Sequence, residues 1–259
     1  MQLEVPRAFY RALRPLVAAA RRGPAILDLG CGSGLLTERL ARAGARAIGI
    51  DASRPMLRLA RERCARWPGR VRLLERRLES LALPPRAWLA LACGDVVNHL
   101  SSARVVERVF RSVRSALAPG GAFAFEAHTP YAYATFWSDN THLLEGPQGD
   151  LLLDCDYDPR RRRAVARMIA YARERDGRHA RAETTLYEYA HTDAEIRRAF
   201  LRAGFGEVWR RPWSPWPDAD EPRLERNLWC GLDPGAGDFA PARALRALRF
   251  RRVARRAAA

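Results

Sequence analysis

Lysine is absent from this 259-residue chain, and all 45 of its basic residues are arginine. Without lysine the protein can form no Schiff base with pyridoxal phosphate and has no lysine nucleophile, so both classes of enzyme are excluded. Apolar residues never run for the ~18 uninterrupted positions that a membrane-spanning helix needs. Arg11 and Arg14 also break up any apolar signal-peptide core near the N-terminus. We therefore expect a cytoplasmic protein that does not bind membranes.

Cysteine is scarce as well, with five residues that are odd in number, widely scattered and without a CxxC pair. Such usage fits a reducing compartment and predicts neither a disulfide framework nor a zinc knuckle. Three of the five histidines show no metal-ligand spacing either, so we expect no bound metal. The cysteines are Cys31, Cys64, Cys93, Cys155 and Cys230, and these histidines are His142, His179 and His191.

Acidic residues are few in comparison with basic ones, 29 against 45, which gives a formal net charge of +16. A surplus of this size suggests affinity for polyanions such as RNA. The exclusive use of arginine resembles a bias of coding composition, although it does not explain why bases outnumber acids. Hydrophobic residues make up 48% of the chain and charged residues 29%, a balance typical of a globular protein.

Short apolar runs alternate with longer amphipathic stretches through the first half of the chain. This alternation predicts βαβ units and a parallel sheet covered on both faces, which is a doubly wound α/β fold. The expected strands are 25–29, 45–50, 71–74, 87–93 and 122–127, and the expected helices are 1–22, 35–43, 55–67 and 103–117.

The second half begins with a stretch of different character, residues 128–190, which is aromatic and polar and then contains three possible antiparallel strands. Insertions of this kind commonly lie over the ligand-binding edge of a sheet, so we expect a substrate lid. We assign residues 1–127 and 191–232 to the core and 233–259 to a basic, helical C-terminal tail. The possible strands of the insertion are 151–157, 164–171 and 180–190; the core resumes with a helix at 193–203, capped by Thr192 or Asp193, and strands at 205–210 and 227–231.

One segment carries a specific chemical signal, Ala25-Ile26-Leu27-Asp28-Leu29-Gly30-Cys31-Gly32-Ser33-Gly34. It reads as a strand that runs into a glycine-rich turn and opens a helix, where free backbone amides can meet a nucleotide-type ligand. The next strand ends at Asp51, about 20 residues further on, where a carboxylate can accept the hydroxyls of a ribose.

The glycines follow the pattern GxGxG after an acidic residue, not the dinucleotide fingerprint GxGxxG. The segment LDLGCGSG, with GIDAS at the end of the next strand, resembles motif I of the class I S-adenosylmethionine-dependent methyltransferases. The resemblance extends to about residue 232, and the segments CGDVVNHL and LAPGGAFAFEAHTPY are similar to a small-molecule bacterial branch of that superfamily. It implies a mainly parallel seven-stranded sheet with helices on both faces and an antiparallel insertion as a lid.

The resemblance also implies S-adenosylmethionine as cofactor, with S-adenosylhomocysteine as product. Asp28 and the glycine loop would hold its methionine part, Asp51 the ribose, and Ala52 and Met56 the adenine. Where the family places an acidic residue near the adenine amine this chain has Arg77, so Glu79 is the expected substitute. The cofactor-binding residues would be Tyr10, Asp28, Gly30, Cys31, Gly32, Gly34, Asp51, Ala52, Met56, Glu79, Cys93 and Asp95.

Residues for the acceptor follow from their place after the fourth and fifth strands of the core. His128 and His99 are the expected general bases if the acceptor must lose a proton. The aromatic segment 131–137 either packs as the core of the insertion or surrounds an apolar or cationic substrate. The expected substrate contacts are Asn98, Tyr131, Tyr133 and Trp137.

The leading hypothesis is thus a methyltransferase for a small-molecule acceptor, acting by in-line displacement as a monomer or homodimer. A tRNA or rRNA methyltransferase is the alternative that the charge of +16 favours, although no RNA-binding module is recognisable. A non-catalytic cofactor-binding subunit is a third hypothesis, and a nicotinamide oxidoreductase a distant fourth.

Overall fold

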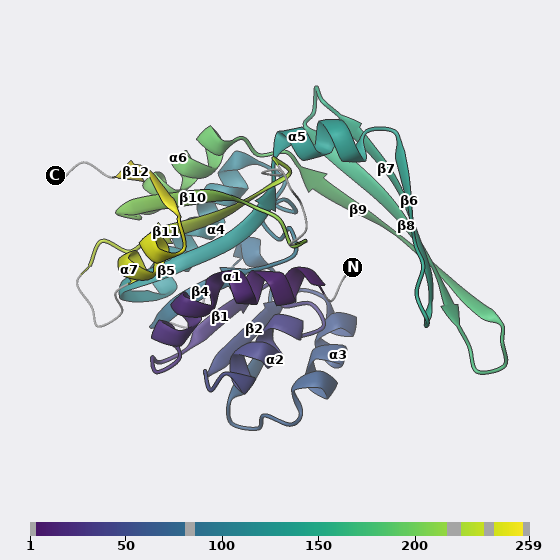
Figure 1. Cartoon of the computed structure of the whole chain (residues 1–259), viewed down its shortest axis with the longest axis horizontal. Helices are drawn as coiled ribbons and strands as arrows, with labels where there is room; N and C mark the ends of the chain where they lie inside the picture. The colour runs from purple at the N-terminus through teal and green to yellow at the C-terminus, as the bar shows by residue number, and fades with distance from the viewer. Residues whose placement is uncertain (1–3, 81–85, 217–223, 236–240, 256–259) are drawn as a thin grey trace.

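The computed structural model describes residues 4–80, 86–216, 224–235 and 241–255. Eight strands form one sheet in the order β12-β10-β11-β5-β4-β1-β2-β3 (Figure 1). Strands β1 to β5 are mutually parallel, whereas β11, β10 and β12 run antiparallel to their neighbours. The strands are β1 (Ile26–Leu29), β2 (Ala47–Asp51), β3 (Val71–Glu75), β4 (Ala87–Ala92), β5 (Leu117–His128), β10 (Glu207–Trp213), β11 (Arg226–Leu232) and β12 (Arg251–Arg255).

The prediction of seven strands is wrong by one, and the reason lies in the C-terminal region. Among its described residues, 233–235 and 241–255, this region is helical only at α7 (Pro241–Ala247), after which β12 pairs with β10 at the edge of the sheet. Arg252 and Arg255 both lie within ion-pairing distance of Glu207, at 3.1 and 3.8 Å. Part of the tail therefore pairs with an acidic residue of the core and completes the core sheet.

Helices cover both faces of this sheet, as the alternation predicts. Helices α1, α2 and α7 bury their apolar side chains against one face, and α4 and α6 bury theirs against the other. On the second face Phe110 of α4 and Phe200 of α6 pack with ring centroids 4.6 Å apart, above Phe123 and Phe125 of β5. The helices are α1 (Glu4–Ala20), α2 (Leu35–Arg42), α3 (Arg54–Cys64), α4 (Ala103–Ala116) and α6 (Asp193–Ala203).

Local capping fixes where several of these helices begin. Thr192 is the N-cap of α6 and forms a reciprocal capping box with Glu195, so the structure selects Thr192 over Asp193. Ser53 and Ser102 cap α3 and α4, where their hydroxyl oxygens accept hydrogen bonds from the amides of Met56 and Val105. None of the described helices is both long and apolar enough to cross a membrane.

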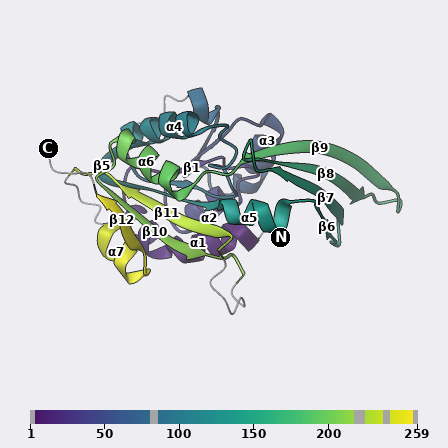
Figure 2. The same cartoon turned by 90° about the horizontal axis from the view of Figure 1, so that it is seen from above.

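Residues 140–189 form a second, antiparallel sheet in the order β6-β7-β8-β9, which we call the arm. It follows α5 (Pro130–Ala132) and a π-helical turn, Tyr133–Trp137, and projects away from the core (Figures 1 and 2). The antiparallel insertion is therefore confirmed, with β6 as a strand that the sequence did not predict. The arm strands are β6 (Asn140–Leu144), β7 (Gly149–Asp158), β8 (Arg163–Arg173) and β9 (His179–Tyr189).

The aromatic cluster of α4, α6 and β5 gives a direct test of the packing. Phe110→Ala is expected to lower the free energy of unfolding by about 3–5 kcal/mol, because a fully buried ring leaves a cavity. Urea unfolding followed by circular dichroism measures this loss. Leu59→Ala on α3, whose side chain is 45% exposed, is the control and should cost less than about 1 kcal/mol. Equal losses in the two variants would contradict the packing described.

Candidate active site

The turn between β1 and α2 needs its glycines for two different reasons. Gly30, Gly32 and Gly34 have φ angles of 64°, 52° and 82°, a region that other residues rarely adopt. A Cβ atom on Gly30 would lie 2.5 Å from Cγ2 of Val96, whereas one on Gly32 would meet nothing within 4 Å. The loop therefore packs closely at one end and leaves an open cradle at Gly32.

Asp51 ties this cradle to the end of the neighbouring strand. Its Oδ2 accepts a hydrogen bond from the Gly32 amide at 2.8 Å, and its Oδ1 accepts one from the Ser53 amide at 2.8 Å. The residue is half-buried, and each carboxylate oxygen has a further lone pair. Asp51 can therefore hold the loop and still accept hydrogen bonds from a diol.

Asp28 lies beneath the same loop and is buried. Its Oδ2 accepts a hydrogen bond from Thr37 Oγ1 at 2.5 Å. Burial, with a smaller contribution from the charge of Asp51, raises the pKa of Asp28 to about 7, although the Thr37 hydrogen bond works in the opposite direction. A cationic ligand beside Asp28 would favour its ionised form.

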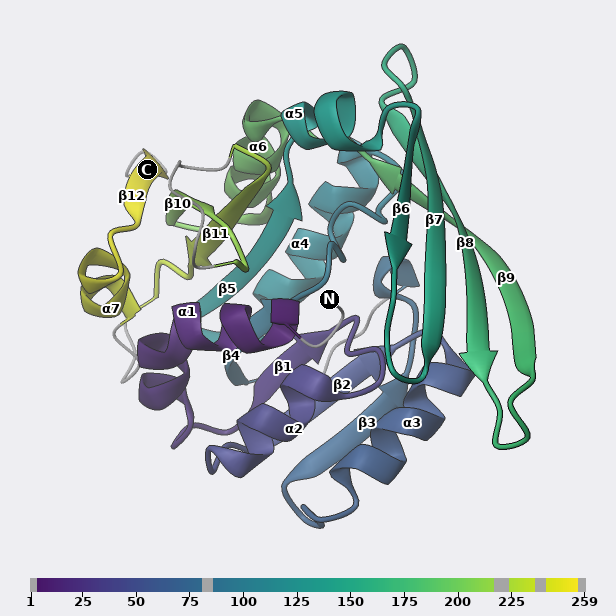
Figure 3. The same ribbon diagram turned by 45° about the vertical axis from the view of Figure 1, so that its right-hand side comes forward.

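The other residues expected at the cofactor lie on several elements. Ala52 and Met56 are exposed just beyond Asp51, and Tyr10 is half-buried on α1, whose N-terminal end reaches toward the ends of β1 and β2 (Figure 3). Glu79 lies 3.4 Å from Arg77 as an ion pair, so the expected substitute for an acidic adenine contact is itself engaged. Burial raises the pKa values of the Cys31 and Cys93 thiols, which argues against either as a nucleophile.

A buried ion cluster lies after β4 and β5. Gly94 and Asp95 both have positive φ angles, 89° and 59°, and both donate their amides to Oε1 of Glu126, at 2.6 and 3.0 Å. Arg226 of β11 donates through Nη1 to Glu126 Oε2 at 2.5 Å and to Asp95 Oδ1 at 2.5 Å, and through Nη2 to Asp95 Oδ2 at 3.0 Å. The two carboxylates raise the pKa of Arg226 despite its burial, so the guanidinium stays charged.

His128 ends β5 beside this cluster and faces two carboxylates. Its Nδ1 lies 3.3 Å from Asp95 Oδ1 and 3.4 Å from Glu188 Oε2. Burial alone would raise the pKa of Glu188, but the hydrogen bonds and charge of His128, with the Tyr133 hydroxyl, lower it overall. Two carboxylate acceptors at Nδ1 place a proton on that nitrogen, so in the neutral imidazole the lone pair lies on Nε2.

Aromatic rings enclose the histidine on the side of the insertion. The centroids of Tyr133 and Trp137 lie 5.5 and 5.8 Å from that of His128, both edge-on. Tyr133 stacks on Tyr157 of the arm and donates its hydroxyl to Glu188 Oε2 at 2.6 Å. Of the expected substrate contacts, Tyr133 and Trp137 are thus brought to His128.

Three expected site residues have other roles in the structure. Asn98 is fully buried and its amide bonds only to main-chain atoms, those of His128 and Tyr189, so it fixes the chain and is not available to a substrate. His99 is exposed, with Nδ1 3.0 Å from the Tyr187 carbonyl oxygen at the base of the arm. Tyr131 is 50% exposed and packs on Phe136. These placements remove Asn98 and weaken the cases for His99 and Tyr131.

Three residues that complete the cluster were not predicted: Glu126, Glu188 and Arg226. Glu126 could have been recognised from the sequence, because a carboxylate inside the apolar run AFAFEA is unusual for a buried strand. Arg226 directly precedes the apolar run NLWCGL in the same way. Glu188 stands in the polar, mostly exposed strand β9 and carried no comparable signal.

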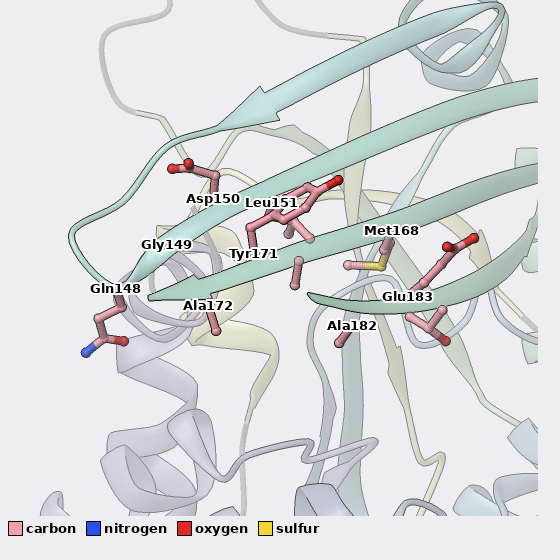
Figure 4. A pocket seen from close by; sticks show the side chains of 11 residues that line it. Gln148, Gly149, Asp150, Leu151, Met168, Tyr171, Ala172, Ala182 and Glu183 are labelled. Carbon is pink, nitrogen blue, oxygen red and sulfur yellow. The ribbon is translucent and has the colours of Figure 1, made fainter. Parts of the chain in front are cut away.

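The arm also carries a hollow of about 480 Å³, apart from the cluster (Figure 4). Side chains alternate across a sheet, so Leu151, Met168 and Thr184 in its lining share a face with Tyr157 and Glu188. One face of the arm therefore runs from the ion cluster to this hollow.

Comparison with known proteins agrees with this geometry. Residues 26–121 match a family model described as a methyltransferase domain. Over this segment the chain is similar to methyltransferase domains. Its matched part holds the glycine loop, Asp51 and Asp95, whereas His128, Glu188 and Arg226 lie beyond it.

The chain also has relatives among curated proteins and solved structures. It is 32% identical over 138 residues to a ubiquinone biosynthesis O-methyltransferase of Xanthomonas campestris, over 50% of this chain and 56% of that protein. The chain spans about half the length of the curated relatives it matches. An S-adenosylmethionine-dependent methyltransferase of Clostridium acetobutylicum superposes with a TM-score of 0.74 at 17% identity, over 90% of this chain and 92% of that one.

A second structural relative is the amino pentose methyltransferase CalS10 of Micromonospora echinaspora, solved with S-adenosylmethionine bound. Its TM-score is 0.67 at 21% identity, over 89% of this chain and 91% of that one. At these identities the superpositions establish the fold.

The ion cluster predicts a large effect of one substitution. Arg226→Met is expected to lower the free energy of unfolding by about 3–5 kcal/mol, because Asp95 and Glu126 would keep buried charges without a counter-charge. Arg252→Met at the exposed edge of the sheet also removes an arginine–glutamate pair and should cost less than about 1 kcal/mol. Urea unfolding of both variants measures the contrast, and similar losses would contradict it.

The raised pKa of Asp28 predicts how stability depends on pH. The group titrates near 3.8 in the unfolded chain and near 7 when folded, so its contribution to stability is full below about pH 4 and falls as the pH rises to about 7. Asp28→Asn removes this loss and should gain on the order of 2–4 kcal/mol over the wild type at pH 8, with no gain at pH 4. Urea unfolding at the two pH values measures it; a gain that is equal at both would contradict the assignment.

Proposed function

We propose that this protein transfers a methyl group from S-adenosylmethionine to a small-molecule acceptor by in-line displacement. The observation that carries the proposal is the hydrogen bond from Gly32 to Asp51, which joins an open glycine cradle to a carboxylate at the edge where parallel strands bind ligands. The ion cluster and His128 follow β4 and β5 at the same edge.

The residues of this edge fit the cofactor by their chemistry. The open space at Gly32 admits close approach of a ligand to the main chain, and Asp51 retains lone pairs for the two ribose hydroxyls. Asp28, beneath the glycine loop, would supply a carboxylate for the methionine part of the cofactor. S-adenosylmethionine, when bound, supplies a methyl group already activated by its sulfonium.

The protein has two tasks in such a reaction: to align the acceptor and to exclude water. Tyr133, Trp137 and Tyr157 form an aromatic wall beside His128. In its neutral form His128 donates from Nδ1 toward Asp95 and Glu188, and its unprotonated Nε2 can then take a proton from the acceptor. The relatives named for ubiquinone and for an amino pentose support a small-molecule acceptor.

RNA remains the second candidate acceptor because of one surface feature. Arg7, Arg39, Arg42 and Arg63 line a hollow of about 240 Å³ between α1, α2 and α3, with Glu38 as the single acidic residue of that lining. Repulsion from Arg7 and Arg42 contributes, after burial, to a lowered pKa of Arg39. Such a cluster suits phosphate groups.

Transfer of a labelled methyl group tests the proposal. The purified chain is given labelled S-adenosylmethionine with the small-metabolite and the RNA fractions of its host in separate reactions at moderate salt. We expect label in the metabolite fraction. Label in RNA alone would favour the alternative, and no label in either fraction, with cofactor binding intact, would overturn a catalytic role on these acceptors.

Asp51→Asn tests the contribution of this carboxylate to cofactor binding. It keeps one acceptor oxygen but loses the charge, so the dissociation constant for S-adenosylmethionine should rise about tenfold to a hundredfold, as measured by isothermal titration calorimetry. Asp158→Asn on the exposed turn of the arm removes the same charge and should leave the constant unchanged. Equal affinities in both variants would contradict the role given to Asp51.

A further inference from the structure

The ion cluster holds more negative than positive charge. Asp95, Glu126 and Glu188 are carboxylates whose side chains are at most 15% exposed. Among the described residues, Arg226 is the only guanidinium in contact with any of them. With His128 neutral, two negative charges remain uncompensated, and protonation of His128 would still leave one. Because unpaired buried charge is costly, the cluster is suited to a cationic guest.

One carboxylate oxygen is placed to receive that guest. Glu188 is 4% exposed, and its Oε2 accepts hydrogen bonds from Tyr133 and His128. Its Oε1 has no partner in the described part of the chain. Glu188 thus presents a free, charged acceptor atom beside a histidine whose Nε2 also has no partner within the described residues.

The surroundings favour an organic cation. Trp137 packs edge-on against His128, and Tyr157 stacks on the buried Tyr133, whose hydroxyl contacts Glu188. Aromatic rings attract ammonium groups and also pack on carbon. Each oxygen of Asp95 already accepts a hydrogen bond from Arg226, so Asp95 is held as a fixed counter-charge.

We propose that the methyl acceptor is a primary or secondary amine that enters as an ammonium ion and donates a hydrogen bond to Glu188 Oε1. This inference rests on the proposed methyltransferase function. The ammonium gives one proton to His128 Nε2, which frees the nitrogen lone pair. A nitrogen–carbon bond then forms as the carbon–sulfur bond breaks, and that electron pair stays on sulfur. The positive charge passes from sulfur to the amine nitrogen, and His128 releases its proton to solvent.

Fractionation of the acceptor pool tests the amine directly. Host metabolites are divided by cation exchange at neutral pH, and part of the cationic fraction is acetylated to block its amines. Labelled methyl transfer is expected in the cationic fraction and should be lost after acetylation. Label confined to the neutral or anionic fractions would overturn the amine while leaving the methyltransferase intact. No label in any fraction would overturn the methyltransferase proposal itself, and the amine with it.

A pair of variants on one strand tests Glu188. Glu188→Gln keeps the shape but removes the charge, so KM for the amine should rise about tenfold to a hundredfold while the dissociation constant of S-adenosylmethionine and the Tm stay close to wild type. Glu183→Gln is the control, because Glu183 lies on the other face of β9 in ion pairs with Arg167 and Arg181. An unchanged KM in Glu188→Gln, or an equal change in the control, would overturn the contact.

A divalent metal ion is the competing cation, since one donor atom each of Asp95, His128 and Glu188 lie within 4.8 Å of one another. Metal analysis of the purified chain, and methyl transfer after dialysis against a chelator, separate the two. We expect no stoichiometric metal and no loss of activity. A bound metal whose removal abolishes transfer would overturn the ammonium assignment.

Discussion

The contact of Arg226 with Asp95 and Glu126 is the constraint on which the acceptor side of the molecule depends. Its guanidinium joins β11 to β5 and to the loop after β4, all in a buried setting where an unpaired charge is costly. Glu126 in turn accepts both amides of the left-handed turn at Gly94 and Asp95. The position of Asp95 follows from these bonds, and the tautomer of His128 follows from the position of Asp95.

The two halves of the site are built on different principles. The cofactor side comes from one continuous strand, turn and helix with a single carboxylate from the next strand, so its geometry is nearly local. The acceptor side combines residues from β5, β11, the loop after β4 and the arm. Glu188 is the contribution of the insertion, and it places a second carboxylate at Nδ1 of His128. The arm thereby changes the charge of the site as well as its walls.

This difference between the two halves explains which parts of the site and the fold could be predicted from the sequence. The glycine loop and Asp51 were predictable because their spacing alone determines the turn, and the parallel core followed from the alternation of apolar runs. The role of Arg226 was not predictable, because it depends on the antiparallel register that places this residue opposite His128. Asn98 was expected to contact the substrate because residues that follow a strand often do so. Its amide is instead buried and forms hydrogen bonds with the main chain. The eighth strand, β12, was not predicted because it lies in an arginine-rich segment whose pattern indicated a helical tail.

The net charge of +16 favours an anionic partner, whereas the acidic cluster favours a cationic one. Which charge a ligand at the site experiences depends on its distance from each group. Exposed arginines act through water and salt, which screen charges beyond roughly 8–10 Å. The carboxylates of the cluster are buried and act over hydrogen-bonding distances, where screening is weak. A small cation at Glu188 would therefore respond to the cluster much more than to the surface, while a polyanion would respond to the surface alone. On this argument the surface arginines would govern contacts with large anions, and the cluster would govern which small molecule enters the proposed site.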